Sequence, residues 1–232
     1  VILLKDGVPF RCRKENLKFM LLRSVFGTLG ILCNFYAVDH LVLADASMLN
    51  KMSPFFAVLF SFLILNEKVK VPQALMVAGA FAGSMFVVKP TLTNMDLVPS
   101  MIGLLGGIGA GAAYTMVRKL GENGEKGPFI VFFFSTFSCL FTLPWLIFDY
   151  HPMSLSQTAI LLMAGIAAAG GQFAITAAYC HAPAREISVY DYSQIIFSAG
   201  LGFVIFGQVP DAFSWLGYGI ICTMAVLMFL YN

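Results

Sequence analysis

The chain has 232 residues, of which 59% are hydrophobic and 11% are charged, and its 14 Lys and Arg against 12 Asp and Glu give a net charge of +2. Soluble domains carry about 25% charged residues, so this composition excludes an ordinary soluble protein. The small net charge, with no basic stripe, argues against a nucleic-acid partner.

Eight mostly apolar stretches follow one another, and each is long enough for one helical crossing of a hydrocarbon core about 30 Å thick. They lie at about 17–38, 44–65, 71–88, 98–117, 128–148, 156–180, 187–207 and 212–231. Within lipid, only helices and closed barrels can span the membrane. The strands of a barrel alternate polar and apolar residues, and this sequence does not show that alternation. The sequence therefore predicts an all-α, polytopic transmembrane helical bundle. The apolar opening, Val1–Leu4, has the character of the tail of a further span, so we expect an incomplete N-terminus.

Basic residues occupy alternate gaps between these stretches. Eleven Lys and Arg fall in one set of gaps, and Lys89 alone falls in the other. Cytoplasmic loops are the ones enriched in Lys and Arg, so we expect the first set in the cytoplasm, and with it the C-terminus. The expected location is a bacterial inner membrane.

An offset of 141 residues relates two parts of the chain. It pairs Ser47 with Ser188 and Asn50 with Asp191, so polar residues coincide with polar residues. By the charge rule, the gaps that precede the two matching stretches lie on opposite sides of the membrane. We therefore expect inverted repeats, which are typical of secondary transporters with a substrate site near the membrane midplane.

Several short motifs cover both copies. They are Asn34-Phe35-Tyr36-Ala37, Ala44-Asp45-Ala46, Leu49-Asn50-Lys51-Met52-Ser53-Pro54, Leu65-Asn66-Glu67-Lys68 and Ala177-Ala178-Tyr179, with the stretch from Ser188 to Gln208. In this arrangement they resemble the EamA-domain transporters of the drug/metabolite transporter superfamily. The resemblance implies two inverted EamA repeats, here residues 1–90 and 91–232, and ten spans. Mapped in this way, we expect eight full spans in this chain, with the first span and most of the second span of the first repeat missing.

Two ionisable residues lie inside predicted spans at nearly matching positions. Lys51 adjoins Asn50, the repeat mate of Asp191. Charges within a membrane are costly and usually face a cavity or a partner. We expect both residues to face one central cavity, where they pair with each other or hold the charged ends of a zwitterion such as an amino acid. The alternatives are an interfacial or ion-paired Asp191 and a Lys51 that extends to the external surface.

Other features of the spans have a structural interpretation. Gly103, Gly107 and Gly111 recur every four residues and predict one smooth helix face for close packing. Pro54 should kink its span. Arg23 is expected to extend to the cytoplasmic surface, with a gate or an anion contact as the alternative.

Polar side chains within the spans either join helices or line a pocket. The predicted substrate-binding residues are Asn34, Tyr36, Asn50, Lys51, Ser53, Tyr114, Gln172, Tyr190, Asp191 and Gln194. The sequence has no nucleophile–base set, no metal-ligand spacing and no nucleotide signature, and its five cysteines are scattered. We expect no enzyme activity, no cofactor and no metal.

The sequence thus predicts a secondary active transporter that moves a small polar, amino-acid-like metabolite by alternating access, in export or exchange. One alternative is a membrane channel, which would favour a repeated ring of pore-lining residues or a selectivity motif. The other is a membrane-embedded enzyme, which would usually show a His, Asp and Glu cluster near one membrane face. The sequence shows neither feature. The expected partners are the small-molecule substrate and the lipid bilayer, with protons as a candidate coupling ion and a homodimer as a further option.

Overall fold

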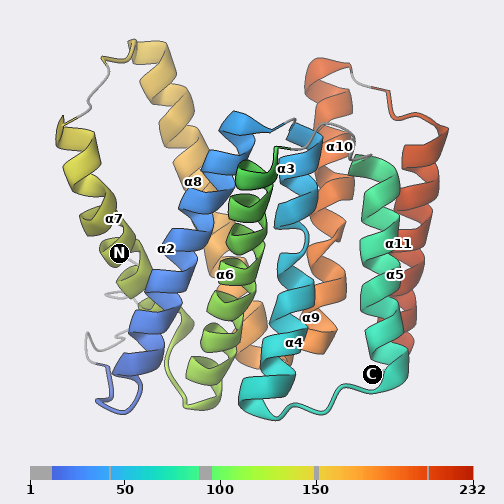
Figure 1. The fold of residues 1–232 in the computed structure, drawn as a ribbon, viewed down its shortest axis with the longest axis horizontal. Coiled ribbons are helices and arrows are strands. Elements are labelled where there is room, and N and C mark those ends of the chain that lie inside the picture. The colour runs from blue at the N-terminus through green and yellow to red at the C-terminus, as the bar shows by residue number, and fades with distance from the viewer. Residues whose placement is uncertain (1–11, 42, 89–95, 149–151, 208, 232) are drawn as a thin grey trace. The chain divides into compact units, whose positions relative to one another are not determined.

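The structure, a computed structural model, describes residues 12–41, 43–88, 96–148, 152–207 and 209–231, and within these ranges it is helical with short turns and no strand (Figure 1). The helices are α2 (Leu17–His40), α3 (Leu43–Asn50), α4 (Ser53–Leu65), α5 (Val71–Val88), α6 (Leu97–Glu122), α7 (Gly127–Phe148), α8 (Leu155–His181), α9 (Ala184–Asp191), α10 (Ser193–Phe206) and α11 (Ala212–Tyr231). The predicted all-α architecture is confirmed.

Six segments of the described chain are long and apolar enough to cross a membrane. They are Leu17–His40, Ala46–Leu65, Leu97–Glu122, Gly127–Phe148, Leu155–His181 and Ala212–Tyr231. The apolar helix α5 is shorter. Helices of this length and composition are what a hydrocarbon core demands, so the chain is a multi-pass integral membrane protein.

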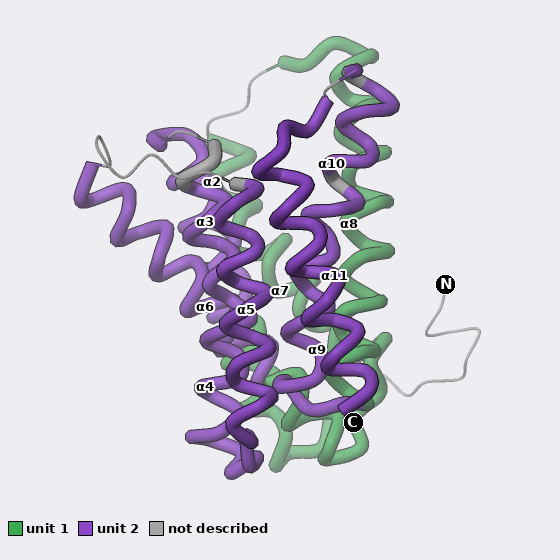
Figure 2. Tube along the Cα trace, turned by 90° about the vertical axis from the view of Figure 1, so that its right-hand side faces the viewer, with its two compact units in different colours: residues 1–25, 116–181 green, residues 26–115, 182–232 purple. Residues whose placement is uncertain are grey.

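The chain forms two compact units (Figure 2). Unit 1 comprises Val1–Val25 and Met116–His181, and unit 2 comprises Phe26–Thr115 and Ala182–Asn232. Unit 1 therefore holds the start of α2, the end of α6, α7 and α8. Unit 2 holds the rest of α2 and α6 together with α3, α4, α5, α9, α10 and α11.

The buried core of unit 1 includes a charged residue. Arg23 is 2% exposed, and its guanidinium carbon lies 3.9 Å from the centroid of the Phe134 ring. The expected extension of Arg23 to the membrane surface is therefore wrong. A planar, weakly hydrated guanidinium over an aromatic face recovers part of the cost of leaving water.

A polar network joins the start of α2 to the loop between α6 and α7 in unit 1. The buried Asn16 donates from Nδ2 to Glu125 Oε1 at 2.8 Å and accepts from Asn123 Nδ2 at 2.6 Å. The Arg13 backbone N–H also donates to Glu125 Oε1, at 3.2 Å. Asn16 is thus buried with both ends of its side-chain amide hydrogen-bonded, which offsets the cost of removing them from water.

Two helices of unit 2 are broken, although the sequence predicted continuous spans over 44–65 and 187–207. Lys51 and Met52 separate α3 from α4, and Tyr192 separates α9 from α10. At the first break, Pro54 has no N–H to donate to the carbonyl four residues earlier. Both breaks tighten into turns with bonds between residues three apart, such as Tyr192 N to the Val189 carbonyl at 3.3 Å.

The two broken helices correspond closely. Adding 141 to the bounds of α3 gives 184–191, which are the bounds of α9. Both broken helices end in a left-handed residue, Asn66 with φ 55° and Gly207 with φ 65°, again 141 apart. Figure 1 shows α3 above α4 but α10 above α9, so the two run in opposite directions.

Glycines bring α6 close to α3 and α4, as the sequence predicted. A Cβ atom at Gly107 would lie 2.7 Å from the Leu49 carbonyl oxygen, and one at Gly111 would lie 2.6 Å from Phe56 Cβ. Only a hydrogen in place of a side chain permits this approach. Helix α6 therefore packs tightly against both α3 and α4, on either side of the first break.

Candidate functional site

The two helix breaks of unit 2 meet. The Tyr192 hydroxyl donates to the Lys51 carbonyl at 3.0 Å, and the Ser188 hydroxyl donates to the Pro54 carbonyl at 3.0 Å. The Lys51 carbonyl lies in the turn between α3 and α4, and the Pro54 carbonyl lies in the first turn of α4; Tyr192 separates α9 from α10, and Ser188 belongs to α9. Side chains of one broken helix thus donate hydrogen bonds to backbone carbonyls of the other.

Opposite charges lie at this meeting point. The half-buried Asp191 carboxylate interacts electrostatically with the half-buried Lys51 ammonium. Asp191 is the last residue of α9, where the helix dipole disfavours a negative charge, while Lys51 directly follows α3, where the dipole favours a positive charge. The ammonium therefore offsets an unfavourable position of the carboxylate.

The Tyr192 ring at the second break packs among apolar side chains. Tyr192 is fully buried, in a cluster with Val77 and Ala80 of α5 and Val189 of α9. Its ring centroid lies 6.4 Å from that of Phe81. Packing on α5 therefore fixes the direction in which the Tyr192 hydroxyl points.

Six of the predicted substrate-binding residues lie beside the two breaks. Asn50, Lys51 and Ser53 flank the turn between α3 and α4, Tyr190 and Asp191 end α9, and Gln194, which is exposed, lies in the first turn of α10. Their exposure differs: Ser53 is buried, whereas Tyr190 is 39% exposed.

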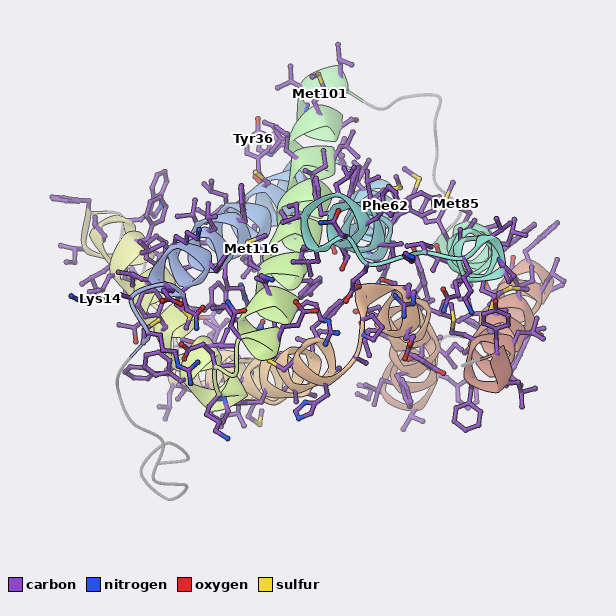
Figure 3. The ribbon with its side chains drawn as sticks, turned by 90° about the horizontal axis from the view of Figure 1, so that it is seen from below. Lys14, Tyr36, Phe62, Met85, Met101 and Met116 are labelled. Atoms are coloured by element: carbon purple, nitrogen blue, oxygen red, sulfur yellow. The ribbon has the colours of Figure 1, made fainter. Side chains whose placement is uncertain are left out.

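The other four predicted residues lie elsewhere on the helices. Asn34 and Tyr114 are half-buried on α2 and α6. Tyr36, labelled in Figure 3, stacks on His40 with ring centroids 4.0 Å apart. Gln172 belongs to unit 1, where its Nε2 donates to the Thr176 hydroxyl of the same helix at 3.3 Å.

No group of three or more His, Cys, Asp or Glu residues within the described ranges is arranged to hold a metal ion. The arrangement at the breaks combines one cation, one anion and several hydroxyls, and charged groups of this kind can make charge-assisted hydrogen bonds.

Comparison with known proteins places this chain in a family. The profile of the EamA-like transporter family matches residues 1–89 and 99–230. The chain belongs to the EamA-like transporter family. It is a membrane transporter of the drug/metabolite transporter superfamily, as the sequence motifs predicted.

Relatives of this transporter are named for different substrates. The pseudopaline exporter CntI of Pseudomonas aeruginosa is 33% identical over 228 residues, which cover 98% of this chain and 76% of that protein. The riboflavin transporter of Vibrio cholerae is 29% identical, over 93% of this chain and 72% of that protein.

The fold of the transporter also has a solved counterpart. One crystal structure superimposes with a TM-score of 0.81, covering 99% of this chain and 81% of that one, at 16% sequence identity. At this level of identity the likeness concerns the fold alone.

The structure adds two residues of the transporter that the predicted site did not include. Ser188 and Tyr192 make the hydrogen bonds that join the breaks. The repeat held a signal for both: at an offset of 141, Ser188 pairs with Ser47 and Tyr192 pairs with Lys51.

Proposed function

We propose that this protein is a secondary active transporter that exchanges or exports a small polar, amino-acid-like metabolite by alternating access. The observation that carries the proposal is the meeting of two broken, antiparallel helices with Lys51 and Asp191 at their breaks. Discontinuous membrane helices place backbone groups and helix ends where substrates bind in several transporter folds.

The proposed architecture has two inverted repeats, residues 1–90 and 91–232, and eight spans. Each broken pair, α3–α4 and α9–α10, then counts as one span, and α5 counts as another. The shared offset of 141 and the opposite directions of the broken pairs support the repeat. The charge distribution supports a cytoplasmic C-terminus in a bacterial inner membrane.

The proposed substrate class follows from the paired charges. A zwitterion presents one carboxylate and one ammonium, so it replaces the Lys51–Asp191 interaction without leaving either charge unpaired. In the empty site, the two residues compensate each other. Asp191 is also the candidate for coupling to protons, because a carboxylate in a partly dry site changes its charge by accepting one proton.

Counterflow in proteoliposomes tests this proposal. Vesicles that contain the purified protein are loaded with a mixed pool of amino acids and small organic acids, and the accumulation of each labelled compound is measured. We expect accumulation of a zwitterion, reduced about tenfold or more in Asp191→Asn and in Lys51→Gln, because each variant loses a charge-assisted contact. Glu186→Gln, which changes a carboxylate on the same helix α9, is the matched control and should retain exchange.

Three further results discriminate within the proposal. The double exchange Lys51→Asp with Asp191→Lys should restore the thermal stability that the single changes lose, but not transport. Wild-type rates in both neutral single variants would remove these residues from the substrate site. Exchange of organic acids alone would disprove the zwitterion while leaving the carrier intact.

A further inference from the structure

An apolar groove lies on unit 2, and its lining residue Val77 belongs to the same buried cluster as Tyr192 at the second break. It is a cavity of about 330 Å³ along α4 and α5, and Lys51 and Asp191 are not among its lining residues. It is lined by Phe55, Val58, Leu59, Phe62, Val69, Val71, Ala74 and Val77. Every lining side chain is apolar, so the groove does not suit the polar substrate proposed for the breaks.

The groove is open at the surface of the helices. Val77 at its base is 2% exposed, whereas Phe62 is 52% and Val71 is 73% exposed. Figure 3 looks onto this end of unit 2 from below, with Phe62 labelled on α4. In a membrane, exposed apolar side chains on spanning helices contact acyl chains.

Two lysines lie at one end of the groove. Lys68 and Lys70 flank the lining residue Val69 in the loop between α4 and α5, and both are exposed. The Lys70 ammonium lies 5.5 Å from the centroid of the Tyr231 ring. The neighbouring carboxylate of Glu67 accepts a hydrogen bond from the buried Ser61 hydroxyl at 2.8 Å, so it is engaged with its own helix end.

We propose that this groove binds one acyl chain of an anionic phospholipid whose phosphate is held by Lys68 and Lys70. Loops rich in Lys and Arg lie on the cytoplasmic side, at the level of the lipid headgroups. Basic residues beside an apolar groove between helices are complementary to a lipid that is negative at one end and apolar along its length. A zwitterionic lipid fits the groove equally well but adds a choline group beside the two lysines.

Native mass spectrometry of the purified protein tests the inference. The protein in detergent is titrated with phosphatidylglycerol or phosphatidylcholine of the same chain length, and the bound fraction is measured. Each lysine near a lipid phosphate contributes about fivefold in affinity, so phosphatidylglycerol should bind about tenfold or more tightly than phosphatidylcholine.

Two variants address the two ends of the lipid separately. Lys68→Gln with Lys70→Gln should abolish the preference for phosphatidylglycerol, whereas Lys126→Gln, an exposed lysine of unit 1, should not. Ala74→Trp should fill the groove and reduce binding of both lipids, whereas Ala82→Trp on the same helix α5 should leave it unchanged.

Several outcomes would overturn the inference. Equal binding of the two lipids, or an unchanged preference in the double lysine variant, would exclude the headgroup site. Unchanged binding in Ala74→Trp would place the lipid outside the groove. Should Ala74→Trp fail to fold, the lysine variant, whose changes lie on an exposed loop, still decides. Displacement of the lipid by a transported substrate would assign the groove to the substrate instead.

Discussion

At the scale of single residues, Tyr192 combines two roles that are usually separate. Its ring is part of the buried cluster on α5, and its hydroxyl reaches the carbonyl of Lys51 on the other broken helix. A phenylalanine would keep the packing and remove only the hydrogen bond. This separability makes the contribution of the hydroxyl measurable.

We predict that Tyr192→Phe lowers the stability of the protein by about 0.6 kcal/mol, and at most about 1.7 kcal/mol, the range found for hydrogen bonds inside membrane proteins. The Lys51 carbonyl loses this donor, and little water is available to replace it. Chemical unfolding in detergent measures the change. Tyr190→Phe, which alters a 39% exposed side chain two residues earlier, is the control. Equal effects in the two variants would contradict a specific role for the Tyr192 hydroxyl.

Cys12 gives a prediction about reactivity outside the membrane-spanning helices. Its thiol lies 3.9 Å from Glu125 Oε1. Partial burial, and then the charge and hydrogen bond of the Glu125 carboxylate, raise the pKa of the Cys12 thiol above its usual value. Only the thiolate reacts with maleimides, so a raised pKa lowers the labelling rate at a given pH.

Glu125→Gln removes the negative charge beside Cys12, so it should lower the pKa of the thiol and speed labelling at pH 8. The difference should vanish at a pH above the thiol pKa of both proteins, where each thiol is fully ionised. The rate is measured in a background in which the other cysteines are serine, namely Cys33, Cys139, Cys180 and Cys222. Glu122→Gln, whose carboxylate pairs with Arg118 and Lys119, is the control. No acceleration in Glu125→Gln would show that burial alone sets the reactivity of Cys12.

At the scale of helices, the two breaks differ in how visible they are in the sequence. Pro54 predicted a disturbance in the first pair, because proline removes a donor from the helix. The second pair has no proline between residues 184 and 206, so nothing local predicted its break. There the turn is stabilised by long-range contacts, the hydrogen bonds of Ser188 and Tyr192, which a single sequence does not display.

The sequence could predict only part of the candidate site, because contacts between distant residues are not visible in a single sequence. Charge inside a span marked Lys51 and Asp191, since such residues are costly and need a partner. Polarity alone also selected Gln172, whose side chain bonds within its own helix in unit 1. Composition and spacing identify which residues are unusual, but which of them meet depends on helix packing.

Glycine substitutions test the packing of α6 against the first broken helix. Gly107→Ala should destabilise the protein by about 1–3 kcal/mol, because the new Cβ would lie 2.7 Å from the Leu49 carbonyl and the helices must move apart. Gly219→Ala on α11 is the matched control, since a Cβ there meets no atom within 4 Å. It should be neutral or slightly stabilising, because alanine favours a helix over glycine.

Thermal and chemical unfolding of both variants in detergent gives the comparison. A destabilised Gly107→Ala with an unchanged Gly219→Ala would support close packing as the reason for glycine in α6. Similar stability of the two variants would mean that α6 can shift away from the break without cost. In that case the region around Lys51 would be less rigid than the contacts indicate.

At the scale of the whole molecule, compact units and proposed repeats divide the chain differently. Unit 2 contains both broken helices, one from residues 1–90 and one from residues 91–232. A site formed at the breaks therefore draws its cation from one proposed repeat and its anion from the other. That composition is expected of a carrier whose substrate lies between inverted halves.

The inverted arrangement makes a prediction about the sides of the membrane. Lys68, in the loop after α4, and Val209, in the loop after α10, are 141 residues apart, and both are exposed. If the repeats are inverted, these equivalent positions lie on opposite sides of the membrane, with Lys68 in the cytoplasm because its loop is basic.

In a cysteine-free background, a membrane-impermeant maleimide applied to intact bacterial cells should label Val209→Cys at once. Lys68→Cys should react only after the cells are permeabilised. Labelling of both positions from the same side would refute the inverted repeats and, with them, the assignment of α3–α4 and α9–α10 as equivalent spans.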